Sequence, residues 1–346
     1  MNTLNPASPY TPRGIVFVPT FNCTAMCRHC NNDFGKHDLS KKMDIKRAVE
    51  LLHEMKALGM NSIQFTGGEI TMYPEFMPPV VVEARKLAIR INKPPTNCYI
   101  AHDRRAAEKF FSDLKEAGYT SGFRLSVDPY HNGKIPLSYV AAFIKYYAEH
   151  FSVSGLTIGS SYYDREEIFR IYDRLLGEMA KAGISDCRLV REKKGIFIGG
   201  KKIKYGIWKP TRPSWQELDD REVELKIIKD TPACLGPHGV GYLWVEPDFR
   251  AKVCSCNGNG FLDYYYIGNL SSESVKDVVK RASENPVFRI LAEGGPARLR
   301  EAVNAKKRVL DPEKKYTFMC ELCNEIVASR QMLEEIGKTS NSRINI

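Results

Sequence analysis

Three cysteines stand close together near the N-terminus, in the segment Cys23-Thr-Ala-Met-Cys27-Arg-His-Cys30. Three thiolates at this spacing can converge on one metal centre. A cubane [4Fe–4S] cluster takes four ligands, usually cysteines, so a three-cysteine loop leaves one iron open for a small molecule. The alternative is a structural zinc site, for which His29 or His37 would supply the fourth ligand.

A second group of cysteines occupies the last third of the chain: Cys234, Cys254, Cys256, Cys320 and Cys323. A Cys-x-x-Cys pair with isolated cysteines upstream is typical of another cluster or of a zinc site. Cys254 and Cys256 are two residues apart, and such residues share a face of a strand. Both are therefore expected near the same site. The two remaining cysteines, Cys98 and Cys187, are predicted to be small buried residues in or beside strands.

Alternating elements position the first group. Between residues 14 and 191 we expect six strands, at 14–18, 62–66, 89–100 (loosely defined, because two prolines interrupt it), 123–127, 156–159 and 187–191. The intervening segments show helical periodicity, as in 45–55, which Asp44 caps and Gly59 ends. This alternation predicts parallel strands and an α/β fold, a partial (β/α)6 TIM-like barrel. Its chemistry should gather where the strands end.

The pattern changes after residue 192, which suggests several parts. We expect a barrel core at 14–192 and a small α+β domain at 231–337, with strands near 242–245 and 252–255 and helices at 272–282, 286–293 and 320–334. The other expected parts are an N-terminal extension (1–13), a connecting loop or hairpin (193–230) and a polar tail (338–346).

The cysteine loop, placed directly after a first strand, resembles that of the radical S-adenosylmethionine (SAM) superfamily. Thr66-Gly67-Gly68-Glu69 ends the second strand and looks like the family's GGE motif, which holds the amino group of SAM. His29 occupies the position of the family's usual aromatic residue before the third cysteine. Ser126 and Asp128 close the fourth strand, where polar residues in this family often contact SAM. His131 follows in the same loop and is a candidate to face the substrate.

The resemblance implies that Cys23, Cys27 and Cys30 hold a [4Fe–4S] cluster whose open iron binds SAM. Reduction then cleaves SAM to a 5′-deoxyadenosyl radical, which takes a hydrogen atom from the substrate. An external one-electron donor such as flavodoxin or ferredoxin would supply the electron.

The later cysteines resemble the shortened auxiliary-cluster ("twitch") domain related to SPASM domains. This resemblance implies an auxiliary [4Fe–4S] cluster on Cys234, Cys256, Cys320 and Cys323. The family's hairpin has a proline before its cysteine, where this chain has Ser255. Cys254 is then spare and is a candidate hydrogen-atom donor. In the alternative, Cys254 is the ligand and Cys256 is spare.

Three functions follow as hypotheses. The first is hydrogen abstraction from a peptide, giving epimerisation, oxidation or a crosslink during ribosomal peptide maturation. The second is dehydrogenation or epimerisation of a sugar or aminocyclitol natural product. The third, from another class, is a non-enzymatic zinc or iron–sulfur structural protein.

The composition indicates a globular protein, with 43% hydrophobic and 27% charged residues and a net charge of +10. The positive charge suits anionic partners or a solvated surface. No basic run is interleaved with aromatic residues, so we expect no nucleic-acid partner. No signal-like segment and no apolar stretch of roughly 18 residues occurs, so we expect no membrane association and a cytoplasmic location. There, reducing conditions favour metal binding by cysteines over disulfides.

Overall fold

The computed structural model describes residues 10, 12–30, 37–162, 164–208, 225–229, 231, 234, 241–254, 263–305 and 308–340. Cys256, most of the expected N-terminal extension, residues 209–224 of the expected connecting segment and the tail beyond residue 340 lie outside the described residues.

The first sheet of the barrel begins with three parallel strands in the order β1-β2-β3. The elements of this part are β1 (Gly14–Phe17), α1 (Ile45–Ala57), β2 (Ser62–Phe65), η2 (Ile70–Met72), α2 (Met77–Lys86) and β3 (Arg90–Ile91). As predicted, α1 starts after Asp44, whose side chain accepts a hydrogen bond from the Arg47 backbone N–H at 2.7 Å.

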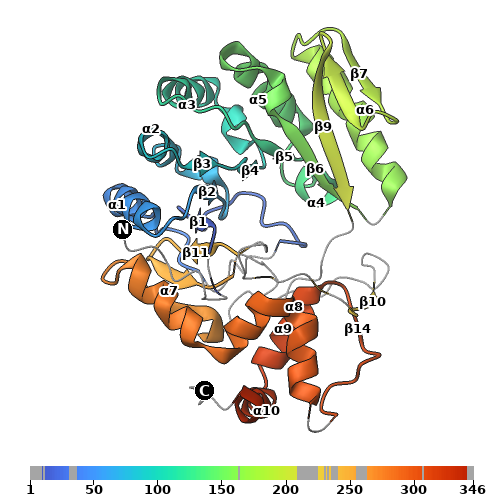
Figure 1. Ribbon diagram of the computed structural model, residues 1–346. Coiled ribbons are helices and arrows are strands. Elements are labelled where there is room, and N and C mark those ends of the chain that lie inside the picture. The colour runs from blue at the N-terminus through green and yellow to red at the C-terminus, as the bar shows by residue number, and fades with distance from the viewer. Residues whose placement is uncertain are drawn as a thin grey trace.

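The second sheet continues the barrel with four parallel strands in the order β4-β5-β6-β9. Its elements are β4 (Pro95–Thr96), η3 (Tyr99–His102), α3 (Arg104–Glu116), β5 (Arg124–Ser126), α4 (Pro129–Asn132), α5 (Leu137–His150), η4 (Val153–Gly155), β6 (Thr157–Ser161), α6 (Arg165–Lys181), β7 (Cys187–Val190), β8 (Gly195–Ile198) and β9 (Lys201–Trp208). Figure 1 shows helices α1, α2, α3, α5 and α6 on the outer side of the strands.

The last parallel strand differs from the prediction. Residues 187–191 were expected to form it, but β7 pairs antiparallel with β8, and β8 pairs antiparallel with β9. Short turns, one of them at Gly199 and Gly200, return the chain at once and allow no parallel crossover. The strand that lies parallel to β6 is β9, which begins inside the segment expected to connect two domains. The domain boundaries themselves remain a prediction.

The loosely predicted segment 89–100 is two short strands, and the described strands form two separate sheets at this point. Pro94 and Pro95 lack backbone N–H groups and so cannot continue a strand ladder. The expected fold class is confirmed: parallel strands with outer helices form an α/β partial barrel, and the described strands do not close into a complete barrel.

The C-terminal part joins the barrel through β1. Strand β11 (Leu243–Val245) pairs parallel with β1, and β12 (Arg250–Lys252) and β13 (Tyr266–Asn269) follow antiparallel. The first sheet therefore has the order β13-β12-β11-β1-β2-β3. The strand expected at 242–245 is confirmed, whereas the one expected at 252–255 ends earlier, at Lys252, so that Cys254 lies after it. The position of this pair beside β1 was not predicted.

Helices cover this end of the sheet (Figure 1). The remaining elements are β10 (Lys226–Ile227), η6 (Asp263–Tyr265), α7 (Val275–Glu284), α8 (Pro286–Asn304), β14 (Lys315–Tyr316), α9 (Met319–Val327) and α10 (Arg330–Ser340). The helix expected at 286–293 extends to residue 304 across a kink at Gly295. The helix expected at 320–334 is instead two, α9 and α10, separated by a break at Ala328 and Ser329.

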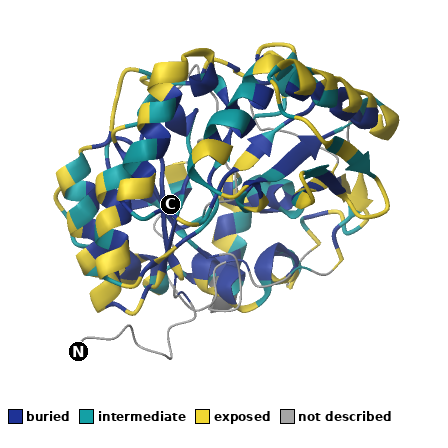
Figure 2. Cartoon of the chain, turned by 90° about the horizontal axis from the view of Figure 1, so that it is seen from above, coloured by how far each residue is buried: buried dark blue, intermediate teal, exposed yellow. Residues whose placement is uncertain are grey.

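Buried strands form the centre of the molecule, and exposed residues lie on the outer helix faces (Figure 2). Cys98 is fully buried, as predicted, whereas Cys187 is half-buried. None of the helices among the described residues combines the length and apolar character needed to cross a membrane.

Candidate active site

A cavity of about 440 Å³ lies at the strand ends of the partial barrel. It is lined by all the residues expected at the SAM site and by the candidate substrate-facing histidine: Cys23, Cys27, His29, Cys30, Thr66, Gly67, Gly68, Glu69, Ser126, Asp128 and His131. The carboxyl ends of neighbouring parallel strands meet at one edge, which explains this convergence of distant segments.

The cysteine loop follows β1 and folds its sulfurs inward. Cys23 and Cys27 are buried, and Cys30 is half-buried. The Ala25 backbone N–H donates to Cys23 Sγ at 3.4 Å, and the Cys30 N–H donates to the Cys27 carbonyl at 2.9 Å. Burial, reinforced by the neighbouring Cys30, raises the pKa of the Cys27 thiol. Such a thiol needs a metal ion to become a thiolate.

The glycines of the GGE motif let the end of β2 lie directly against the cysteine loop. The Gly68 N–H donates to the Thr20 carbonyl at 2.9 Å. A Cβ atom on Gly68 would stand 2.2 Å from the Asn22 carbonyl oxygen, which leaves no room for any side chain. The motif therefore also fixes the position of the cysteine loop, a role beyond the expected contact with SAM.

Glu69 is buried and its carboxylate has four hydrogen-bond donors. Oε1 accepts from the Thr71 N–H at 3.1 Å, the Thr71 hydroxyl at 2.7 Å and the Thr96 hydroxyl at 2.7 Å. Oε2 accepts from the Asn97 N–H at 2.7 Å. Burial raises the pKa of Glu69, and these donors counteract the shift. Oε2, with one donor, keeps acceptor capacity for a ligand.

Asn97 is a site residue that the sequence analysis missed. Its Nδ2 donates to Cys23 Sγ at 3.7 Å, while its Oδ1 accepts from the Tyr99 N–H at 2.9 Å. It lies just after β4, in a segment whose two prolines obscured the strand end. A polar residue immediately after a strand was the only available signal.

Asp128 is 2% exposed and caps the short helix α4. Its Oδ1 lies 2.8 Å from His131 Nδ1, and its Oδ2 accepts from the Ser161 N–H at 3.2 Å. Burial alone would raise the pKa of Asp128, but His131 and Ser161 outweigh it and hold that pKa below the ordinary value. Asp128 thus fixes the orientation of His131.

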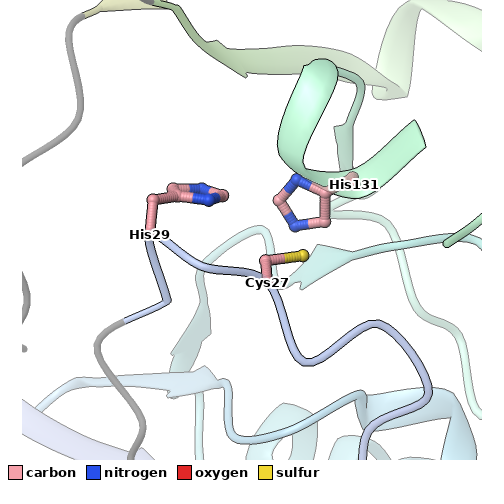
Figure 3. A group of neighbouring side chains, drawn as sticks. All are labelled: Cys27, His29 and His131. Atoms are coloured by element: carbon pink, nitrogen blue, oxygen red, sulfur yellow. The ribbon is translucent and has the colours of Figure 1, made fainter. Parts of the chain in front are cut away.

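His29 lies beside His131, at a ring-centroid distance of 5.1 Å. Figure 3 shows the two imidazoles next to the sulfur of Cys27, and the ligand atoms of the three residues lie within 4.8 Å of one another. Burial lowers the pKa of His29 to about 4, and its Nδ1 has no partner among the described residues. A neutral imidazole here has one nitrogen available to a ligand. His37 instead stacks on Phe21 at 3.5 Å.

Arg124, Trp208 and Trp244 line other parts of the cavity and were also missed. Arg124 and Trp208 pack together over Gly159, where a Cβ would stand 3.2 Å from Arg124 Cδ and 2.7 Å from Trp208 Cη2. More than a third of Arg124 is accessible, yet the surrounding protein lowers the pKa of its guanidinium. Arg124 has no ion pair and Trp244 Nε1 no hydrogen-bond partner among the described residues.

Four of the C-terminal cysteines also come together. Burial and a nearby Cys254 thiolate raise the pKa of Cys234 to about 12. Burial raises the pKa of Cys323 as well, and Cys254 and Cys234 act on it in the same direction. Cys320 and Cys323 lie in the first turns of α9, three positions apart and so on one side of the helix. Cys254 is therefore close to the sulfurs expected to bind metal.

Both donor sets fit iron–sulfur clusters. The first offers three cysteine sulfurs beside an open cavity, and the second offers four cysteine sulfurs, of which those of Cys234, Cys320 and Cys323 belong to buried residues. Sulfur-only coordination is typical of iron–sulfur clusters and of structural zinc.

Comparisons with known proteins agree with this architecture. The superfamily described as "Radical SAM superfamily" matches residues 17–175. Comparison with curated proteins finds no match. The solved structure "Native anSMEcpe with bound AdoMet" is similar, with a TM-score of 0.51, 13% identity, and coverage of 95% of this chain and 98% of that chain. "Native anSMEcpe with bound AdoMet and Cp18Cys peptide" gives a TM-score of 0.51, 13% identity, and coverage of 96% and 99%. At this identity the likeness shows the fold alone. Residues 17–175, which include the cysteine loop and the strand-end residues that meet in this cavity, thus form a radical SAM domain.

Proposed function

We propose that this radical SAM enzyme takes a hydrogen atom from a peptide, leading to epimerisation, oxidation or a crosslink during the maturation of a ribosomally made peptide. The observation that carries the proposal is the convergence of the cysteine loop, the GGE motif and the strand-end polar residues on one cavity. When bound, a [4Fe–4S] cluster and SAM supply the one-electron cleavage that yields a 5′-deoxyadenosyl radical.

Particular residues would hold these cofactors. Cys23, Cys27 and Cys30 would bind three irons. The remaining acceptor capacity of Glu69 Oε2 suits the SAM ammonium group, because a carboxylate with an unfilled lone pair forms a charge-assisted hydrogen bond. His29 and the strand-end residues Ser126 and Asp128 would line the SAM pocket.

His131 is proposed to face the substrate from the cavity wall. Because its Nδ1 is bonded to Asp128 Oδ1, the other ring nitrogen is the one directed away from that carboxylate. This arrangement fixes the ring and favours a positioning role over free movement.

The C-terminal cysteines are proposed to hold an auxiliary [4Fe–4S] cluster on Cys234, Cys320, Cys323 and one hairpin cysteine. The position of Cys254 beside Cys234 and Cys323 supports Cys254 as that ligand. Cys256, outside the described residues, would then be the spare cysteine and the candidate hydrogen-atom donor. This assignment is the reverse of the one that the hairpin pattern suggested.

The cavity supports an acidic substrate group. Arg124 lines it and has no ion pair among the described residues. An arginine without an ion pair at the cavity wall can form a charge-assisted, bidentate hydrogen bond with an anionic group of the substrate. An acidic peptide fits this requirement and the net charge of +10. We further propose a cytoplasmic enzyme reduced by an external donor such as flavodoxin or ferredoxin.

Metal analysis tests the class of protein. Protein purified without oxygen should carry about eight irons and eight sulfides per chain, falling to about four in the Cys23→Ala/Cys27→Ala/Cys30→Ala variant. Zinc in place of iron would support the structural metalloprotein instead.

Mass spectrometry tests the substrate class. The reduced enzyme is incubated with SAM and a library of short acidic peptides in D2O. Epimerisation incorporates one deuterium, whereas a crosslink or oxidation removes two hydrogen atoms. Turnover of an aminocyclitol with no change in any peptide would support the natural-product hypothesis.

A further inference from the structure

Three consecutive tyrosines, Tyr264 to Tyr266, lie where η6 meets β13, and their hydroxyls have different partners. Tyr264 donates to Asn285 Oδ1 at 3.2 Å, and Tyr266 donates to Glu246 Oε1 at 2.7 Å. Tyr265, between them, donates to Cys323 Sγ at 3.2 Å. The middle hydroxyl is therefore the one directed at a proposed cluster ligand.

Tyr265 is held rigidly in this position. The side chain is 1% exposed, and its backbone carbonyl accepts from the Val253 N–H at 3.2 Å, next to Cys254. Burial and this backbone hydrogen bond therefore fix the direction of the hydroxyl toward Cys323 Sγ.

The hydroxyl has a second acceptor within reach. Asn324 Oδ1 lies 3.1 Å from the same oxygen. A phenol has one proton to donate, so the sulfur and the amide oxygen compete for it. A charged thiolate is the stronger acceptor of the two, which favours donation to Cys323 when that cysteine binds metal.

We propose that the Tyr265 hydroxyl is a fixed hydrogen-bond donor to the ligand Cys323 and raises the reduction potential of the auxiliary cluster. The inference rests on the proposed function, since it requires that cluster. Reduction adds negative charge to the cluster and its ligand sulfurs, so a donor stabilises the reduced form more than the oxidised one. Tyr265 acts through Cys323 and is a positioning residue. A bound auxiliary cluster would then be the easier to reduce because of this hydrogen bond.

The test uses the full-length chain with Cys23, Cys27 and Cys30 replaced by alanine, so that only the auxiliary cluster contributes. Its midpoint potential is measured by a redox titration followed by electron paramagnetic resonance. Tyr265→Phe should keep about four irons per chain. The reduced-to-oxidised ratio at a fixed potential should fall about tenfold, a shift of about 59 mV to more negative potential for one electron.

Tyr264→Phe is the matched control, because it removes a neighbouring buried hydroxyl that is bonded to Asn285 rather than to sulfur. Its midpoint should equal that of the parent. Asn324→Leu removes the competing acceptor and should move the midpoint in the positive direction. This variant tests the inference even if Tyr265→Phe loses its iron.

Equal midpoints in the parent and the Tyr265→Phe variant would overturn the role of Tyr265 while leaving the cluster in place. If the Tyr265→Phe variant loses its iron, the Asn324→Leu variant decides instead. A midpoint potential equal to that of the parent would then overturn the role of Tyr265 as well. A parent chain that binds no iron would overturn the auxiliary cluster itself, and with it this inference.

Discussion

Asn97 links Cys23 to the GGE motif. Its side-chain amide donates to Cys23 Sγ at 3.7 Å, while its backbone N–H donates to Glu69 Oε2 at 2.7 Å. One residue after β4 thus contacts both the proposed cluster ligand and the carboxylate proposed to hold SAM.

Replacing Asn97 with aspartate should weaken the first cluster. Aspartate keeps an oxygen that accepts from the Tyr99 N–H. It replaces the amide group that donates to Cys23 Sγ with a negatively charged oxygen. A hydrogen bond to a charged group is worth about 1.5–3 kcal/mol, so SAM cleavage should fall at least about tenfold. Release of 5′-deoxyadenosine measures it. Asn92→Asp is the control, since Asn92 bonds to Tyr242. Equal cleavage in the two variants would contradict the proposed link.

Cys27→Ala should abolish SAM cleavage and remove about four irons per chain, because two cysteines should not retain a cluster. Iron analysis and 5′-deoxyadenosine release report the two effects. Cys187→Ala, at a half-buried cysteine of β7, should change neither. Cleavage by a Cys27 variant that lacks the cluster would be inconsistent with the proposed site.

Cys254 and Cys256 should differ sharply despite standing two residues apart. Cys254→Ser should lose the iron of the auxiliary cluster, about four per chain, because Cys254 lies beside Cys234 and Cys323. Cys256→Ser should keep that iron and change the product instead. Iron content and peptide mass spectra measure the two outcomes. Iron lost from Cys256→Ser alone would restore the assignment suggested by the hairpin pattern.

Arg124→Gln should separate substrate binding from SAM chemistry. Because Arg124 is proposed to bind the acidic group of the peptide, turnover should fall at least about tenfold, the loss of a charged hydrogen bond. Cleavage of SAM without peptide should stay within about twofold. Arg188→Gln, on β7 away from the cavity lining, is the control. A parallel loss of both activities would show that Arg124 serves SAM instead.

Asp128→Asn should destabilise the metal-free chain at neutral pH by about 1–3 kcal/mol, because it leaves a buried network without its charge. The pKa of folded Asp128 lies below its ordinary value of 3.8. The carboxylate therefore stabilises the fold fully above the ordinary pKa, and this contribution is lost as the pH falls through the lower, folded value. Urea unfolding between pH 7 and pH 3 should show the wild-type advantage shrinking. Asp113→Asn, in an exposed pair with Lys109, should show little effect at either pH.

Sequence spacing alone determined the local features. The helical period and Asp44 predicted α1, because capping and periodicity depend on neighbours in the chain. The cysteine loop after β1 and the GGE motif after β2 predicted that the residues proposed to hold cofactors lie at strand ends, since alternating strands and helices imply a parallel sheet. The cavity that unites them confirms that they meet.

Only the tertiary structure decided which distant segments became neighbours. Strand β11 lies beside β1, and β9 rather than residues 187–191 completes the parallel strands. The sequence of one strand does not specify which distant strand will pair with it, because many strands have the same pattern of apolar and polar residues. For the same reason Arg124 and Tyr265 read as an ordinary cation and an ordinary aromatic residue. Their partners, an open cavity and a buried sulfur, exist only once the chain has folded.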